Sequence, residues 1–289
     1  MSEGERLVLT FFDTPIQIAS PFPSKEALER AQLEKYRLDY LLRLGEVPFE
    51  DVRRGAEPPD FLVMRDGTPH GVDCAALALE KKRLAEALFT KLIQKVAAKD
   101  NTFLRHLART HVTVWFSHGT ELPPRVTDHS IVPELIEALE HVNVDRDRIG
   151  RITADIARHG FPQTFPEEIA IVDKESFGFQ VAPSDSWQAR DALSAQLGFD
   201  VSLSFPFAIQ DVRAEMQRLV SSHDNDRINQ LLVSIGGPNR DGVCFPAEHD
   251  LSSLLKEDPL GPVSAQHISQ VTAHTWSSGE FFDVPVGKS

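Results

Sequence analysis

The chain has 289 residues, a formal net charge of −13 and 41% hydrophobic residues, among them 18 Phe. This composition supplies enough apolar material for a packed core, which excludes an intrinsically disordered chain. The acidic balance also argues against a protein that coats nucleic acid through its overall charge, because phosphate binding needs Lys and Arg side chains to displace counterions. A nucleic-acid partner would therefore require a local basic patch.

The sequence has neither a membrane-insertion pattern nor a cysteine scaffold. Its first segment, MSEGERLVLTFF, is acidic with a short apolar run, unlike a signal peptide. No apolar run approaches the length of about 18 residues that is needed to span a bilayer. Cys74 and Cys244 are the only cysteines, too few for a disulfide framework or a four-thiolate zinc site. We therefore expect a cytoplasmic protein with no membrane partner.

The first half of the sequence alternates between strand and helix patterns. We expect a strand at 7–12, a helix from the N-cap Ser24 to Gly45, strands at 60–64 and 71–77, a helix at 79–99 and a strand at 111–118. In the first helix the expected buried face carries Leu28, Ala31, Leu38, Leu41 and Leu42, and in the second it carries Ala85, Leu88, Phe89, Leu92 and Val96. The Asp66-Gly67 pair between the two middle strands is typical of a hairpin turn.

The second half has weaker periodicity. We expect helices at 132–142, 148–160 and 211–223, strands at 167–173 and 177–183, and a β run from 226 that breaks at Gly236-Gly237-Pro238 before a strand at 243–245. For the last thirty or so residues we expect a loose tail or a packed-down arm. The whole pattern predicts an α/β protein with a mixed central sheet flanked by helices. Residues 1–125 would form the core, and 126–289 would complete it or form a partner-binding lobe.

Two acids occupy matching ends of the predicted strand pair. Asp60 begins the first strand and Asp73 lies inside the second, where burying an ionised carboxylate costs several kcal/mol unless it is compensated. Magnesium keeps several waters and needs only one or two protein carboxylates, so this pair would be sufficient for a metal site. The alternatives are that Asp60 caps a turn and that Asp73 points outward to solvent on an alternating strand.

The segment from Pro59-Asp60 through the hairpin to Asp73 resembles the PD-(D/E)xK nuclease superfamily, whose signature sits on such a strand pair with a helix before and after it. The likeness covers Ser24 to His118 and implies a restriction-endonuclease-like core. It also implies that Asp60 and Asp73 bind one or two divalent cations, Mg or Mn, and that the protein cleaves DNA or RNA in a bacterial nucleic-acid-processing or defence setting.

The sequence departs from that signature at its lysine. The resemblance implies a catalytic lysine two residues after Asp73, but Ala75 occupies that position. In some relatives the following helix supplies this group, and here Lys81, Lys82 or Gln94 could do so, with Lys82 as the catalytic candidate. Other relatives have lost catalysis. The alternative function is therefore a catalytically inactive nuclease-fold protein with an interaction or regulatory role.

Two helices could complete the site. On the first, Glu34 falls on the expected buried face and would support the metal; the alternative is that it pairs with Lys35 or Arg37 at the rim. The second helix carries a basic strip that could follow a phosphate backbone or simply face solvent. That strip consists of Lys81, Lys91, Lys95 and Lys99. We also expect a protein partner or a homodimer as alternatives for the second half, and a small-molecule pocket near Gly236-Gly237 as a third class of function.

Overall fold

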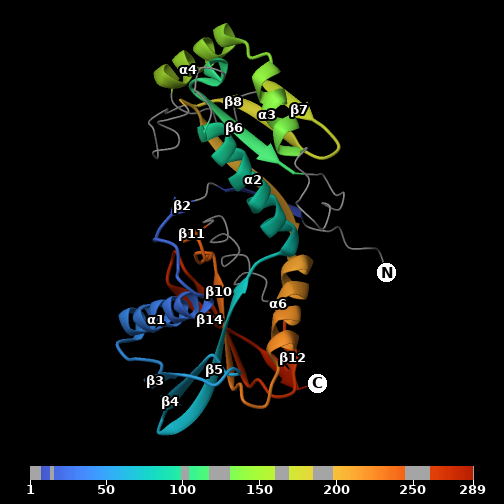
Figure 1. Cartoon of the computed structure of the whole chain (residues 1–289). Coiled ribbons are helices and arrows are strands. Elements are labelled where there is room, and N and C mark those ends of the chain that lie inside the picture. The colour runs from blue at the N-terminus through green and yellow to red at the C-terminus, as the bar shows by residue number, and fades with distance from the viewer. Residues whose placement is uncertain are drawn as a thin grey trace. The chain divides into compact units, whose positions relative to one another are not determined.

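The computed structural model describes residues 8–13, 16–98, 104–116, 131–159, 169–184, 198–244 and 261–288. Within these ranges the protein is a mixed α/β structure with several sheets and five α-helices, as the sequence predicts at the level of fold class (Figure 1). The chain divides into two compact units. Unit 1 comprises Met1–Leu9, Pro15–Leu79 and Phe207–Ser289, and unit 2 comprises Thr10–Thr14 and Glu80–Pro206. The expected division at residue 125 falls inside unit 2.

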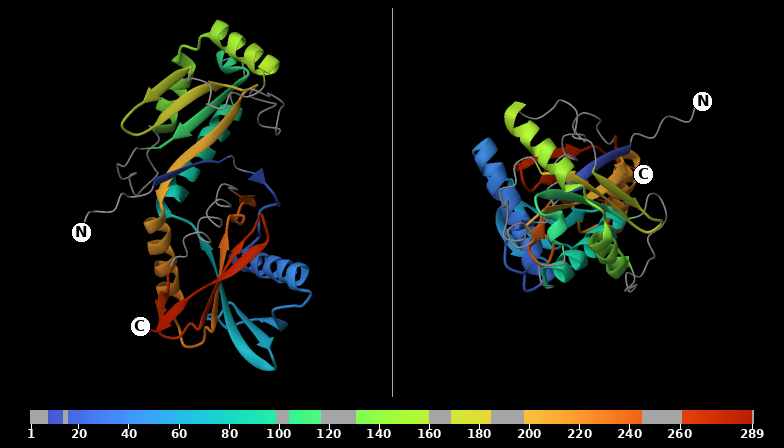
Figure 2. Two further views of the ribbon diagram at one scale, coloured as in Figure 1. Left: turned by 180° about the vertical axis from the view of Figure 1, so that it is seen from behind. Right: turned by 90° about the horizontal axis from the view of Figure 1, so that it is seen from above.

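Unit 1 is built on a six-stranded sheet. Its order is β14 (Glu280–Val284), β13 (Gln270–Thr275), β10 (Gln230–Ile235), β5 (Thr68–Leu77), β4 (Phe61–Arg65) and β3 (Glu50–Arg54). Strands β3, β4 and β5 form an antiparallel meander, and β10 runs parallel to both β5 and β13. Helices α1 (Lys25–Leu44) and α6 (Ile209–His223) lie on opposite sides of this sheet (Figures 1 and 2). Two short pairs accompany it: β2 (Ile16–Gln17) with β11 (Val243–Cys244), and β12 (Val263–Ala265) with β15 (Val286–Lys288).

The predicted hairpin is confirmed as the β4–β5 pair. Its turn residues have positive φ angles, 50° at Asp66 and 73° at Gly67, as a type I′ turn requires. This turn twists in the same sense as the flanking strands, so it fixes their register. Phe61 consequently lies opposite Val72.

Helix α1 has the predicted ends, but the prediction of its buried face is wrong. Ser24 Oγ accepts the N–H of Ala27, and Gly45 ends the helix at a φ of 78°. The buried residues are Glu29, Gln32, Leu33, Tyr36 and Asp39. Leu38, Leu41 and Leu42 are instead 51%, 42% and 73% exposed. Polar side chains can occupy the buried face because they find partners there, such as His274 for Asp39 and Arg54 for Glu29.

A five-stranded sheet lies mostly in unit 2, with the first residues of β1 (Val8–Asp13) and the last residues of β9 (Asp200–Ala208) in unit 1. Its order is β1, β9, β6 (Thr110–Trp115), β8 (Gly178–Pro183) and β7 (Ala170–Asp173). The helices of unit 2 are α2 (Glu80–Ala98), the short 3-10 turn at Arg105–Leu107, α3 (Ile131–His141) and α4 (Arg146–His159). The predicted apolar face of α2 is confirmed, since Ala85, Leu88, Phe89, Leu92 and Val96 are all buried in one core.

The sequence patterns did not predict every element. Strands β3 and β9 were both missed. Strand β3, with the sequence EDVRR, is a polar edge strand in which no residue is buried. Residues 261–288 contain strands β12 to β15 rather than a loose tail, and β13 lies between β10 and β14 in the main sheet. Among the helices of the described residues, none combines the length and apolar character needed to cross a bilayer.

Candidate metal centre

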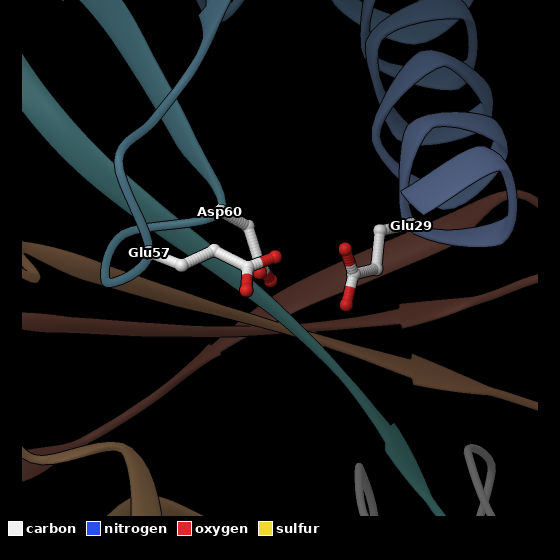
Figure 3. Close-up of side chains that lie close together, drawn as sticks. All are labelled: Glu29, Glu57 and Asp60. Atoms are coloured by element: carbon white, nitrogen blue, oxygen red, sulfur yellow. The ribbon is translucent and has the colours of Figure 1, made fainter. Parts of the chain in front are cut away.

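Three carboxylates from separate parts of unit 1 converge at one point (Figure 3). Glu29 comes from the second turn of α1, Glu57 from the loop between β3 and β4, and Asp60 from the position directly before β4. One oxygen of each lies within 4.8 Å of the others. Glu29 and Asp60 are 3% and 6% exposed, whereas Glu57 is exposed. A set of carboxylate oxygens is the ligand type that Mg²⁺ and Mn²⁺ prefer.

Backbone hydrogen bonds fix the position of Asp60. Its Oδ2 accepts the N–H of Cys74 at 2.9 Å, and its own N–H donates to Asp73 Oδ1 at 2.7 Å. The loop before it folds back tightly, because the N–H of Gly55 donates to the Asp60 carbonyl at 2.9 Å. A Cβ atom on Gly55 would stand 1.9 Å from the Pro59 carbonyl oxygen, so only glycine fits this approach.

Two basic side chains compensate the three acids. Arg54, at the end of β3, donates from Nη1 to Glu29 Oε2 at 2.9 Å and from Nη2 to Glu57, and its Nη2 lies 3.9 Å from Asp60 Oδ1. Lys25 Nζ lies 2.7 Å from Glu29 Oε1, and the hydrogen bond to this carboxylate raises the pKa of Lys25. A divalent cation would compete with Arg54 for the same oxygens.

The carboxyl group of Asp60 binds a proton more readily than an ordinary aspartate does. Burial raises the pKa of its carboxyl group to about 6, against the stabilising hydrogen bond from Cys74, and the nearby charges of Asp73 and Glu29 raise it further. Burial also raises the pKa of the Cys74 thiol well above its ordinary value, which keeps this side chain neutral. The site therefore favours a proton or another cation at Asp60.

Asp73 accepts the backbone N–H of Asp60, but the Asp73 carboxylate belongs to a different network. Its neighbours Val72 and Cys74 pack in the same core cluster as residues of α1, so the alternation of a strand turns Asp73 toward the other face. There Asp73 Oδ2 lies 2.9 Å from His223 Nδ1 at the end of α6, while Oδ1 accepts the Asp60 N–H. The structure thus links the two predicted acids through the backbone and joins Asp60, but not Asp73, to the carboxylate cluster of the described residues.

The acid that α1 contributes is Glu29, whereas the sequence pattern pointed to Glu34. Glu34 is 40% exposed at its side chain, and its carboxylate binds Arg30 at 3.0 Å and Arg37 at 2.7 Å, which matches the alternative of a rim ion pair. The available signal was the spacing of Glu29 to Leu33 and Tyr36, four and seven residues later, which places it on the buried face.

The predicted lysines all belong to unit 2, whereas both strand-pair acids belong to unit 1. Lys82 is buried, and its Nζ lies 2.7 Å from Glu86 Oε1 on the same helix. Lys91 and Lys95 are exposed on α2, and Lys95 borders a hollow with Glu137 of α3. Of the predicted basic strip, Lys99 and the side chain of Lys81 lie outside the described residues. Ala75, at the position of the missing lysine, is buried.

The chain was also compared with known proteins. No protein-family model, no curated protein and no solved structure matches it. The functional assignment therefore rests on the geometry and the electrostatics of the carboxylate cluster.

Proposed function

We propose that the protein is a divalent-metal-dependent nuclease that cleaves DNA or RNA in a bacterial nucleic-acid-processing or defence setting. Glu29 and Asp60 bind Mg²⁺ or Mn²⁺, Glu57 closes the site from its loop, and Asp73 stands beside it. The observation that carries the proposal is the convergence of two buried carboxylates and a third acid at one end of the β4–β5 pair. The helix before this pair and the strand-pair acids agree with the resemblance to the PD-(D/E)xK nucleases.

The chemistry of phosphodiester cleavage explains why such a cluster would be useful. A hard cation held by carboxylates neutralises charge that develops on the phosphoryl oxygens and makes a bound water acidic enough to act near neutral pH. Asp60 would exchange its proton for the cation, which removes the cost of its burial. Arg54 would lose its carboxylate partners. Its guanidinium could then bind a phosphate through two parallel hydrogen bonds. His223 would hold the carboxylate of Asp73 in place.

A cleavage assay with matched variants tests this function. Purified protein is incubated with labelled DNA and RNA, with Mn²⁺, with Mg²⁺ and with a chelator. Cleavage is expected only with a metal, and Glu29→Gln and Asp60→Asn should each lower the apparent metal affinity by at least about tenfold, because each removes a ligand oxygen.

The control is Glu34→Gln, on the same helix but engaged with Arg30 and Arg37 outside the cluster. It should cleave as the wild type does. Cleavage that persists in the Glu29→Gln and Asp60→Asn double variant would remove the basis of the proposal.

The second candidate is a nuclease-like protein without catalysis, which acts in interaction or regulation. Two observations favour it: Ala75 stands where the resemblance implies a lysine, and Arg54 already serves as the cation of the cluster. Calorimetry separates the two candidates. If the cluster is purely structural, we expect neither Mn²⁺ binding nor cleavage. We also expect Arg54→Ala to be strongly destabilised.

A further inference from the structure

Unit 1 contains a second concave site that shares no residue with the carboxylate cluster. It is a cavity of about 440 Å³ between the C-terminal half of α1, the β3–β4 edge of the sheet and strands β13 and β14. This volume lies within the range of about 300–1,000 Å³ that is usual for small-ligand sites. Both its aromatic and its charged lining residues restrict the chemistry of a ligand.

Three aromatic rings form one wall. Tyr40 and Phe281 stack with their centroids 4.9 Å apart and an interplanar angle of 17°. Tyr36 meets both rings edge-on, at 5.8 Å and 70° to Tyr40 and at 5.6 Å and 86° to Phe281. Burial raises the pKa of the Tyr36 hydroxyl, so this ring stays neutral. The inner faces of the stacked Tyr40 and Phe281 rings cover each other, and an outer face of such a pair is electron-rich and attracts a cation.

Acidic residues outnumber basic residues among the described residues that line the cavity. Glu46, Glu50, Asp66 and Asp283 of this lining carry carboxylates, and Arg65 carries a guanidinium. Arg65 donates to Gln270 at 2.6 Å, and Asp283 accepts a hydrogen bond from the Thr272 hydroxyl at 2.8 Å, so both are held at fixed positions. A phosphate-bearing ligand would be repelled here, whereas a cation would gain from both the carboxylates and the rings.

We propose that this cavity binds an organic cation, an alkylammonium or guanidinium group, that packs against Tyr40 and Phe281 with Asp283 as its counter-ion. The same chemistry is present in a basic side chain of a peptide and in a free polyamine. The proposal does not depend on nuclease activity, because its residues are separate from the metal centre.

Isothermal titration of the full-length protein with five probes tests the ligand class. Acetyl-arginine amide and acetyl-lysine amide represent peptide side chains, and spermidine represents a free polyamine. Acetyl-norleucine amide is a neutral probe of similar length, and AMP offers an aromatic base with a phosphate. A cationic probe should bind at least about fivefold more tightly than the norleucine probe, as a cation–π contact with a nearby carboxylate implies.

The relative affinities of the probes identify the source of the cation. Tighter binding of the amino-acid amides indicates a peptide side chain, and tighter binding of spermidine indicates a polyamine; either result supports the site. Equal binding of the norleucine probe, preferential binding of AMP, or no binding by any cation would overturn the proposal.

Matched variants locate the binding. Tyr40→Leu removes the stacked ring and Asp283→Asn removes the counter-ion, so each should lower the affinity of the cationic probe by at least about threefold. Asp226→Asn, an exposed acid of the same unit that does not line the cavity, is the control and should leave the affinity unchanged. Circular dichroism confirms that each variant is folded. A loss with Asp226→Asn equal to the loss with Asp283→Asn would show a general charge effect and would overturn the assignment to this cavity.

Discussion

Asp60 links the stability of the fold to the protonation of one buried carboxyl group. Its carboxyl group is almost fully buried, and it accepts a hydrogen bond from the backbone N–H of Cys74 at 2.9 Å, with Arg54 Nη2 at 3.9 Å. The ionised form is therefore poorly solvated, and the charges of Asp73 and Glu29 add to this cost. Either a proton or a metal ion relieves the cost.

The raised pKa of Asp60 predicts a defined pH dependence of stability. The pKa rises from 3.8 to about 6 on folding, so between these values the folded state binds more protons than the unfolded state. The contribution of Asp60 to the free energy of unfolding is then highest below pH 4, falls as the pH rises toward about 6 and is constant above it. Asp60→Asn lacks this titration, so its stability relative to the wild type should rise over that window by about 1–3 kcal/mol, the lower values reflecting solvent screening of the carboxylate.

Urea denaturation of both proteins at several pH values between 4 and 8, without divalent ions, measures this difference. If the proposed metal site is correct, saturating Mn²⁺ at pH 7.5 should stabilise the wild type more than Asp60→Asn, because the variant lacks a proposed ligand oxygen. A stability difference that does not vary with pH would show that Asp60 titrates normally.

At the scale of an element, helix α1 illustrates the limit of counting apolar residues. Its leucines at positions 38, 41 and 42 suggested one face, but the sheet is covered by the face that carries Leu33 and Tyr36. The polar residues of that face are stabilised by partners distant in sequence, such as His274, whose Nε2 lies 2.7 Å from Asp39 Oδ2. The periodicity of the helix sequence does not predict these partners.

The orientation of α1 predicts opposite outcomes for two similar substitutions. Leu33→Ala should destabilise the fold by about 2–5 kcal/mol, because Leu33 is fully buried and its truncation leaves a cavity. Leu42→Ala should change the stability by less than about 0.5 kcal/mol, because Leu42 is 73% exposed. Chemical denaturation measures both. Equal costs for the two variants would contradict this orientation.

At the scale of the whole molecule, the chain forms two units, and unit 2 interrupts the sequence of unit 1 twice, at Thr10–Thr14 and between Leu79 and Phe207. All three residues of the carboxylate cluster belong to unit 1. Metal binding should therefore stabilise unit 1 directly, by an amount set by the metal concentration relative to its dissociation constant.

Hydrogen exchange with and without Mn²⁺ tests this location. Peptides from α1, β4 and β5 should exchange more slowly with the metal, because their opening would break the site. Peptides from β6 and β8 of unit 2 should be unaffected. Slower exchange in unit 2 alone would place the metal outside the proposed centre.

Local sequence determined the features that depend on neighbouring residues. The cap at Ser24, the Gly45 end of α1, the Asp66-Gly67 turn and the apolar face of α2 all follow from steric and hydrogen-bonding preferences within a few residues. The alternation of strand and helix patterns in the sequence was sufficient to predict the mixed α/β class. The hairpin register places Phe61 opposite Val72, and the Asp60 N–H next to Phe61 donates to Asp73 Oδ1.

Only the tertiary structure decided which polar groups meet. It brought Glu29 rather than Glu34 to Asp60, set Arg54 among the acids, paired Asp73 with His223 and placed β13 beside β10. The Arg54–Glu29 and Asp73–His223 contacts join residues 25 and 150 positions apart. The reason is that a buried charge goes where a partner compensates it, and the choice of partner depends on the packing of the whole sheet rather than on any local pattern.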